Sequence, residues 1–480
     1  MKINNNISAV VTNKQLLRTE DSLTAAMQRL SSGLKINHSK DDPSGMAISG
    51  KMHTQIKGLG RASQNANDGV SVIQTADGAL SEVTSMLQRM RELSVQAANE
   101  LNSPDERGAV QKEIGSLRNE IDRVSSDTEF NTKSLLDGSL DTRVYGEHFS
   151  RTYVSESVTP GTYKMTINSA AEQASTSNAT ATALTGTVTA AQAGAMKING
   201  VGIKITEGMS ASEVYESLRK GAEEASCQIS NEGDPLKISS NYYGKSSSVE
   251  VVFGNEGLRD YFGFTDLKTT SYGKDADITL KTEDLTTNPP VFGFSKQATV
   301  NTDGNRYTVT DTNGFEMEFL AQNDAVKDGT GTVISGWSTG DLDIEVSDIG
   351  PMVLQIGANE SQNMKVRIPS ISSENMYLDE IDVTKAGGPD RAMANLDKAI
   401  ARVSEIRSGM GANQNRLEST VMSLDETDEN MNSAVSRIED SDMAAEMAEY
   451  TRYNVLQQAA TSVLSQANEI PQTALQLLQK

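Results

Sequence analysis

The feature that most constrains the fold is a seven-residue repeat in the first third of the chain. Apolar or small residues recur at this spacing from Leu59 to Leu101, and a second series, which includes Ala62 and Gly69, follows three residues further on. Such a repeat is typical of a helix that packs along a coiled-coil seam. The largest predicted seam residues are Ile73, Leu80 and Leu87. The helix would be about 60 Å long at 1.5 Å per residue, and its apolar stripe requires a partner.

This helix is expected to end at Asn102, where the signals for a second helix begin. Ser103 is predicted to cap that helix, with Pro104 at its first position and Glu106 completing a capping box. The predicted apolar face consists of Val110, Ile114, Leu117, Ile121 and Val124.

The last hundred residues repeat this pattern. Heptad positions run from Leu396 to Ala445 and predict one very long helix, with Leu417, Leu424 and Ile438 among its seam residues. A second apolar stripe follows and reaches almost to the last residue. Because isolated helices gain most of their stability from packing, we expect the two terminal arms to bury each other's stripes and to bring the chain ends together.

The middle of the chain, residues 140–351, has a different periodicity. Short runs with period 2 alternate with Gly, Asn and Asp and predict β-strands; they are Tyr163-Met165-Ile167, Ile203-Ile205, Val249-Val251-Phe253, Phe315-Met317-Phe319 and Leu342-Ile344-Val346. One amphipathic helix is predicted near Ser212 to Glu224, and the segment Ser169 to Gly194 is interpreted as a linker or exposed loop, open to O-linked sugars. The fold class is therefore α + β multidomain, with long α-helical coiled-coil arms formed by both termini and a β-rich domain inserted between them.

The residue types needed for most site chemistry are missing or scattered. Cys227 is the only cysteine, so the chain can form neither an internal disulfide nor a thiolate metal cluster, and we expect this side chain to be buried. The histidines His38, His53 and His148 form no HExxH motif, and no phosphate loop of the Walker type is present. We predict no catalytic, cofactor-binding or metal-binding residue.

Charge and hydropathy exclude two classes of partner. The net charge of −22 repels phosphate backbones and anionic membranes. No run of about 20 apolar residues exists, and the start, MKINNNISAV, lacks the regions of a cleavable signal peptide. We expect no nucleic-acid partner, no membrane partner and no signal cleavage.

The first heptad helix carries one apolar residue outside its seam. Arg89, Leu93 and Gln96 share the face opposite the seam, whereas Met90 falls on the seam itself. Leu93 is either an isolated surface side chain or part of a second, outward-facing interface. A fibre subunit requires such an interface, because a head-to-tail contact that does not close builds an open helical assembly.

Six segments, in order along the chain, resemble signature blocks of the bacterial flagellins. They are LSSGLKINHSKDDPSGMAISGKM, NANDGVSVIQTADGALSEVTSMLQRMRELSVQAAN, NEIDRVSSDTEFNTKSLLDGS, LQIGANESQ, SRIEDSDMAAE and LQQAATSVLSQANEIPQTALQLL. Within the middle, AMKINGVGIKITEGMSASEVYESLRKGAEE resembles a small hairpin-plus-helix module of flagellin outer domains.

The resemblance implies three domains. Residues 1–42 and 448–480 would form a terminal coiled-coil core that lines an inner tube and is disordered before assembly. Residues 43–139 and 352–447 would form a helical-bundle domain with a small β element in an outer tube. Residues 140–351 would form a variable outer domain, with possible subdomains at 140–275 and 276–351. The residues of the terminal coiled-coil core that drive polymerisation would be Ile7, Val10, Leu17, Leu456, Val463, Ile470 and Leu477.

The resemblance also implies a function and partners. The chain would polymerise with itself into the helical filament of the flagellum and enable swimming. It would be extracellular, exported unfolded by the type III apparatus, bound at its C-terminal arm by an export chaperone, and assembled with filament cap and hook–filament junction proteins. Asp440 and Asp442 would contact neighbouring subunits from a helical surface. A host Toll-like receptor would recognise the free monomer through Gln88, Arg89, Leu93 and Glu113.

Three alternatives remain at this point. Some flagellin-like proteins carry catalytic inserts, which the scarcity of catalytic motifs argues against. A junction protein between hook and filament has similar ends, but the completeness of the six blocks favours a flagellin. An adhesive role for the outer domain could coexist with polymerisation, and the sequence does not distinguish it from a plain solvated surface.

Overall fold

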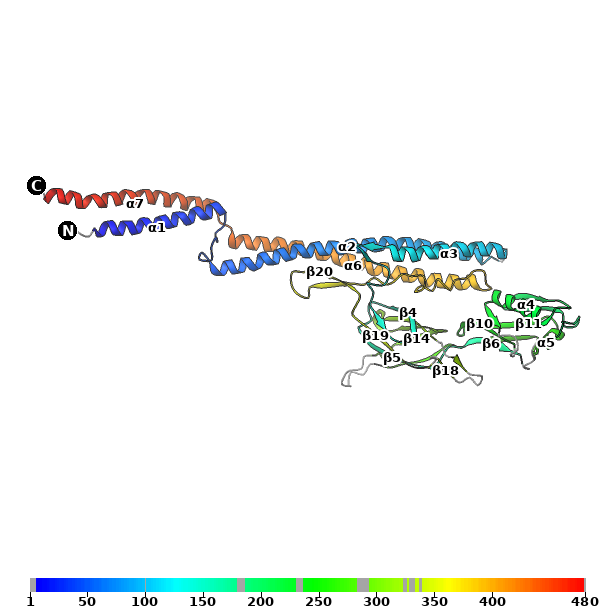
Figure 1. The fold of residues 1–480 in the computed structure, drawn as a ribbon. Helices are drawn as coiled ribbons and strands as arrows, with labels where there is room; N and C mark the ends of the chain where they lie inside the picture. Colours follow the sequence, from blue (N-terminus) through cyan, green and yellow to red (C-terminus); the bar gives the residue numbers. More distant parts are fainter. Residues whose placement is uncertain are drawn as a thin grey trace. The chain divides into compact units, whose positions relative to one another are not determined.

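The structure is a computed structural model that describes residues 6–99, 101–178, 186–229, 236–282, 293–322, 326–327, 333–335 and 339–478 (Figure 1). The chain divides into two compact units. The first comprises Met1–Val70, Leu354–Met364 and Asn415–Lys480, and the second comprises Ser71–Val353 and Lys365–Gln414. The three-domain division implied by the family resemblance stays a prediction.

Helices occupy both ends of the chain and confirm the expected α + β class. The helices are α1 (Ile7–Ser32), α2 (Pro43–Ala97), α3 (Pro104–Asp127), α4 (Ala211–Glu224), α5 (Glu256–Phe262), α6 (Gly388–Glu439) and α7 (Met443–Leu478). The first heptad repeat lies on α2 except for its last residue. The predicted helix end at Asn102 is wrong, because α2 ends at Ala97 and Leu101 lies beyond it with 89% of its surface exposed. The capping box of α3 is present as predicted: the Glu106 backbone N–H donates to Ser103 Oγ at 3.3 Å, and the Ser103 N–H donates to Glu106 Oε2 at 2.7 Å.

The prediction of a single long helix through Ala445 is wrong, because the helix is interrupted between the end of α6 at Glu439 and the start of α7 at Met443. At the break, Asp440 forms an isolated β-bridge with Leu34, and the Ser441 N–H donates to the Gly33 carbonyl at 3.0 Å. Asp442 accepts hydrogen bonds from the first backbone N–H groups of α7. Both aspartates therefore hold the break rather than lie on a helical surface, since backbone pairing with a segment far away in sequence replaces the helical hydrogen bonds.

The β-rich part contains three four-stranded antiparallel sheets and one three-stranded sheet. One sheet has the order β13 (Asp277–Leu280), β5 (Gly161–Ser169), β19 (Gly340–Val346), β3 (Val144–Tyr145). The next has the order β14 (Thr299–Asp303), β15 (Arg306–Thr310), β16 (Glu316–Ala321), β4 (Phe149–Val154). The third has the order β12 (Lys268–Tyr272), β11 (Ser248–Phe253), β7 (Gly194–Ile198), β8 (Val201–Ile205), and the three-stranded sheet has the order β6 (Gln173–Ser177), β10 (Lys237–Tyr243), β9 (Cys227–Ile229).

Short two-stranded pairs complete the described strands. They are β1 (Glu129–Phe130) with β2 (Lys133–Ser134), β17 (Val326–Lys327) with β18 (Val333–Ser335), and β20 (Met352–Gln355) with β21 (Asn363–Val366). A 3-10 helix spans Thr312–Gly314. The five period-2 runs predicted as strands all lie on strands, namely β5, β8, β11, β16 and β19.

Two separate cores lie in this β-rich part. One core is built from β4, β5, β15, β16 and β19, and the other from β7, β8, β10, β11 and the helices α4 and α5. The structure does not follow the expected subdivision at residue 275, because β3, β4 and β5 pair with strands that follow that residue. The second core is thus an insertion within the first. Period-2 patterns identify strands but not their partners, so the sequence did not reveal this nesting.

The segment interpreted as a linker is partly a strand. β6 pairs with β10, and Ala174 is fully buried in the second core. Small residues bury little surface, but backbone pairing with β10 holds them in the sheet. Residues 179–185 of the same segment lie outside the described residues. Helix α4 lies where the sequence predicted it. Cys227 is buried as expected, and this burial raises the pKa of its thiol to about 11.

Close backbone packing fixes the β20–β21 hairpin against α2 in the first unit. A Cβ added at Gly58 would lie 2.9 Å from Ala358 Cβ, and one added at Gly69 would lie 2.4 Å from Leu354 Cδ1. Asn65 Nδ2 donates to the Gln355 carbonyl at 3.0 Å. These two glycines therefore leave the space that the hairpin occupies.

Candidate assembly surface of the terminal helices

Helices α1 and α7, from opposite ends of the chain, lie side by side (Figure 1). Asn6 serves both of them: its Oδ1 accepts from the Ala9 N–H at 3.1 Å and caps α1, while its Nδ2 donates to the Ala467 carbonyl of α7 at 2.9 Å. The first turn of α1 is thereby tied to the second half of α7.

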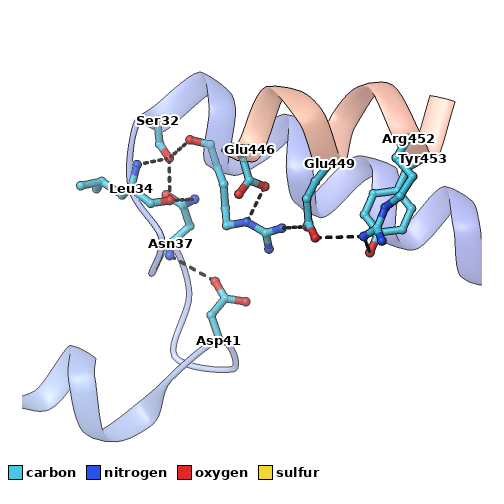
Figure 2. Close-up of polar contacts among 9 residues, drawn as sticks. Ser32, Leu34, Asn37, Asp41, Glu446, Glu449, Arg452 and Tyr453 are labelled. Carbon is cyan, nitrogen blue, oxygen red and sulfur yellow. Dashed lines mark hydrogen bonds and ion pairs between the residues drawn. The ribbon is translucent and has the colours of Figure 1, made fainter. Parts of the chain in front are cut away.

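An ion pair joins the other end of α1 to the first turns of α7. Arg29 Nε lies 2.7 Å from Glu446 Oε1, and Arg29 Nη2 lies 3.8 Å from Glu449 Oε2. Figure 2 shows Glu446 and Glu449 facing the end of α1. Glu449 also accepts from Arg452 at 2.9 Å. Because the Glu446 side chain is only 10% exposed, this contact is worth more than a solvated surface pair.

The loop between α1 and α2 has a defined local structure. Gly33 ends α1 with φ of 74°, a left-handed conformation that glycine adopts without strain. Asp41 Oδ2 accepts from the backbone N–H groups of Asn37 and His38 at 3.1 and 2.9 Å (Figure 2 draws the Asn37 bond). Hydrogen bonding, most of all from His38, lowers the pKa of Asp41. The helix therefore stops at Ser32 and the chain becomes helical again at Pro43, where α2 begins.

The paired arms leave much of their apolar surface open. The described polymerisation residues expose between 47% and 69% of their surface; they are Ile7, Val10, Leu17, Leu456, Val463 and Ile470. Leu23, Ala26 and Ala467 are buried. The side chain of Leu477 lies outside the described residues. A continuous exposed stripe of this kind is typical of an association surface.

The predicted seam residues lie in the interior of the helical parts. Ile73, Leu80, Leu87 and Leu417 are fully buried, Leu424 is 8% exposed, and Ile438 is only half-buried. Leu59, Ala62 and Leu424 form a small apolar cluster in the first unit, against which Met431 also packs. In the second unit, Arg407 Nε of α6 donates to Asp77 Oδ1 of α2 at 2.8 Å beside the seam.

The expected recognition patch on α2 and α3 is only partly at the surface. Gln88, Arg89 and Glu113 are exposed, and Arg89 Nη2 lies 2.9 Å from Glu113 Oε1. The hydrogen bond that Arg89 donates to Glu113, followed by the one it donates to Glu92, raises the pKa of Arg89. The interpretation of Leu93 as an outward-facing residue is wrong, because Leu93 is 2% exposed. It lies one helical turn beyond Arg89, whose side chain pairs with Glu113 of α3.

Sequence reasoning also missed a buried charge cluster in the second unit. Glu318 occupies a polar position of the alternating pattern of β16, yet it is 5% exposed. Both carboxylate oxygens are paired, one with Arg306 of β15 and the other with Arg402 of α6. The Arg306 guanidinium lies 3.9 Å from the centre of the Tyr377 ring. The sequence does not distinguish Glu318 from Glu316 on the same strand, because the Arg402 partner on α6 lies far along the chain.

Other kinds of site find no support in the part of the chain that the structure describes. No helix there is long and apolar enough to cross a membrane. The described residues form no group of three or more His, Cys, Asp or Glu side chains that could hold a metal ion. His53 Nε2 lies 2.9 Å from Glu439 Oε2, and side-chain hydrogen bonds from Ser49 first and from His53 second lower the pKa of the Glu439 carboxyl.

The fold and the site define a class, namely an α + β structural protein with paired terminal helices and an inserted β-rich region. Comparison with known proteins supplies the family. A family model for the bacterial flagellin N-terminal helical region matches residues 3–141, and one for the bacterial flagellin C-terminal helical region matches residues 393–478. A flagellin of Salmonella muenchen is 32% identical over 524 aligned residues, which cover 99% of each chain.

Two further proteins are similar. Polar flagellin A of Vibrio parahaemolyticus is 29% identical and the alignment covers 100% of this chain and 99% of that relative. The solved structure of FliC from Burkholderia pseudomallei is 17% identical, covers 72% of this chain and 99% of its own, and has a TM-score of 0.24. The chain belongs to the bacterial flagellin family, whose members are structural proteins of the extracellular flagellar filament.

Proposed function

We propose that this chain polymerises into the helical filament of the bacterial flagellum, which enables swimming, and that α1 and α7 carry the association. The observation that supports this proposal most strongly is the exposed apolar stripe of the paired arms, whose described residues keep about half or more of their surface open. Fully burying a Val, Leu or Ile side chain stabilises by about 1.5–3 kcal/mol. Covering the remaining half would therefore contribute about 1 kcal/mol for each residue.

The arrangement of this surface favours an open assembly. The stripe runs along α1 from Ile7 to Leu17 and along α7 from Leu456 to Ile470, so one subunit offers adhesive surface along the length of both arms. A contact between different faces of successive subunits, when it does not close into a ring, builds a helical polymer. In the proposed filament, residues 1–42 and 448–480 line the inner tube.

Export and assembly partners follow from the same surface. An exposed apolar stripe on a free monomer invites premature association. We propose that the monomer is exported unfolded, without a cleaved signal peptide, through the type III apparatus, with an export chaperone on the C-terminal arm. Addition then takes place outside the cell, with a filament cap protein and junction proteins between hook and filament as partners.

Seeded polymerisation tests the role of the arms. Purified protein would be seeded at high salt and imaged by electron microscopy, beside a deletion of Ala448–Lys480 and the substitution Val463→Asp, which places a charge in the stripe. Thr461→Asp is the matched control, because Thr461 is exposed on the opposite face of α7. Intact protein and Thr461→Asp should form filaments, and the other two should not. Filaments from the deletion, or none from the intact chain, would refute the mechanism.

A second proposal concerns recognition of the free monomer by a host Toll-like receptor. Gln88, Arg89 and Glu113 form an exposed polar group on two adjacent helices. An arginine held by acidic neighbours keeps its planar donors oriented for a partner. Arg89→Ala should weaken receptor binding by the monomer, whereas Arg91→Ala, on an exposed residue paired with Asp397 at 2.6 Å, should not. If both variants bound the receptor equally well, Arg89 would not be part of the recognition surface.

A further inference from the structure

A second site is indicated by a cavity of about 610 Å³ in the second unit, where several parts of the chain meet. Its walls come from the end of β10 (Asn241–Tyr243), the β14–β15 turn, the segment Tyr377–Asp382 and the first turns of α6. The turn packs tightly on β10, because a Cβ added at Gly304 would lie 2.8 Å from the Tyr243 carbonyl oxygen. This volume falls within the range of small-molecule sites, which commonly lie at such junctions.

Three polar atoms in the cavity wall are buried without a hydrogen-bond partner. They are Asn241 Oδ1, Asn305 Oδ1 and Tyr377 Oη. An unpaired buried polar group costs about 1–3 kcal/mol, so three at one cavity require an explanation. Together they offer two amide acceptors and one hydroxyl that can both donate and accept.

Tyr377 is the most constrained of the three. It is 2% exposed and its backbone has φ of 56°, a left-handed conformation that is rare for an aromatic residue. The Arg306 guanidinium lies 3.9 Å from the centre of its ring, and Tyr377 is one of the residues that line the cavity. Burial raises the pKa of Tyr377 to about 12, so the hydroxyl keeps its proton at neutral pH. Strained residues of this kind cluster at ligand sites.

The cavity wall also contains a cation without an acidic partner. Arg306 is paired with Glu318, and Lys398 Nζ lies 3.7 Å from Asp303. Among the described residues, the Arg391 guanidinium has no carboxylate partner; it stacks on Tyr242 with 3.8 Å to the ring centre. Arg391 is exposed, so a ligand entering the cavity can reach it.

The acidic residues of the wall are already engaged. Glu380 lies 3.2 Å from Arg151, and Asp382 accepts from Thr384 and lies 3.3 Å from Lys385. Asp303 faces Lys398. The positive charge of Arg391 is therefore the charge in the cavity wall that a ligand would neutralise.

A smaller cavity of about 350 Å³ shares Tyr242, Ser246 and Arg391 with the first. Its wall includes Ser226, whose Oγ is also buried without a partner. The Tyr242–Arg391 stack therefore belongs to the walls of both cavities. A ligand with several hydroxyl groups along its length could satisfy both.

We infer that these cavities bind a short acidic oligosaccharide, with sugar hydroxyls bonded to Asn241, Asn305 and Tyr377 and a sugar carboxylate paired with Arg391. Hydroxyl groups supply the donors that the amide oxygens lack, and a carboxylate matches the planar donors of a guanidinium. The site belongs to the β-rich region and is separate from the terminal arms. Two sources of the carboxylate, a sialic acid and a hexuronic acid, share this chemistry.

The test is calorimetric titration of the full chain with sialyllactose, with digalacturonate, and with lactose as the neutral probe. At least one acidic probe should bind with a dissociation constant below about 1 mM, and more tightly than lactose. Arg391→Gln should weaken acidic binding about tenfold or more, and Tyr377→Phe, which removes only the hydroxyl, about fivefold. Arg219→Gln, on an exposed α4 arginine paired only within its helix, is the matched control and should leave binding unchanged.

Each variant would be checked by thermal unfolding, so that Tyr377→Phe decides the outcome if Arg391→Gln does not fold. Absence of saturable heat with both acidic probes overturns the inference. Equal affinity of the wild type and both folded variants for the acidic probes also overturns the inference. A crystal structure of protein soaked with the acidic probes that shows only water in the cavities overturns it as well.

Discussion

Arg29 Nε lies 2.7 Å from Glu446 Oε1, although 417 residues separate the two along the chain. The pair joins the end of α1 to the beginning of α7, next to the loop where the chain passes into α2. It therefore holds the terminal arms together at the end opposite to the Asn6 contact with Ala467.

Replacing Arg29 should loosen the paired arms. Arg29→Ala leaves the nearly buried Glu446 carboxylate without its charged donor, and a lost hydrogen bond to a charged group costs about 1.5–3 kcal/mol. The thermal disassembly temperature of filaments should fall. The matched control is Arg18→Ala, at an exposed position of the same helix, which should change this temperature little. Identical disassembly of the two variants would contradict the role of the pair.

Two glycines of α2 should respond in opposite ways to alanine. A Cβ at Gly60 meets nothing within 4 Å, so Gly60→Ala should stabilise by about 1 kcal/mol through helix propensity. A Cβ at Gly58 would meet Ala358 Cβ at 2.9 Å and its Cα at 3.3 Å, and such overpacking costs about 1–3 kcal/mol. Urea unfolding should rank Gly60→Ala above wild type and Gly58→Ala below it; the reverse order would show that the hairpin does not pack there.

Leu93→Ala should destabilise the protein by about 2–5 kcal/mol, because it leaves a cavity in the interior. Val95→Ala is the control on the same helix, since Val95 is 50% exposed and surface changes usually stay within about 0.5 kcal/mol. Thermal unfolding distinguishes them. If the Leu93→Ala protein were as stable as the Val95→Ala protein, the buried position of Leu93 would be contradicted.

The capping box should make the start of α3 sensitive to acid. Hydrogen bonds from Ser103, its backbone N–H first, lower the pKa of Glu106 below the ordinary value of about 4.3. A group with a lowered pKa in the folded state stabilises above its unfolded pKa, and this contribution is lost as the pH falls through the folded pKa. The protection of the first-turn backbone N–H groups of α3, measured as hydrogen exchange relative to the intrinsic rate at each pH, should therefore fall as the pH drops below the ordinary carboxyl pKa of about 4.3. Glu106→Gln should abolish that pH dependence, and its persistence would assign it to another group.

The thiol of Cys227 should be inert in the folded protein. Its pKa of about 11 leaves almost no thiolate at pH 8, and the side chain is 3% exposed. A disulfide reagent should label it slowly in buffer and rapidly in guanidinium chloride. Equal rates in both would mean that the β9 strand opens readily.

Much of the local structure was predictable because its causes are local. The capping box needs only Ser103 and Glu106 three residues apart, and the strands β5, β11 and β19 follow from alternation along short runs. The heptad repeat identified α2 and most of its buried residues for the same reason. The α7 part of the exposed stripe also follows from its spacing, whereas Ile7, Val10 and Leu17 of α1 were named only through the resemblance to the flagellins.

The tertiary structure alone decided which elements meet. The break at 440–442 depends on Gly33 and Leu34, and Leu93 is buried although it lies outside the heptad seam. The nesting of one β core within another depends on strand partners, and the pairing of Glu318 depends on Arg402 of α6. Periodicity along the chain determined helices, strands and their apolar faces. It did not determine burial or pairing, because these are set by side chains that are distant in sequence and close only in the folded chain.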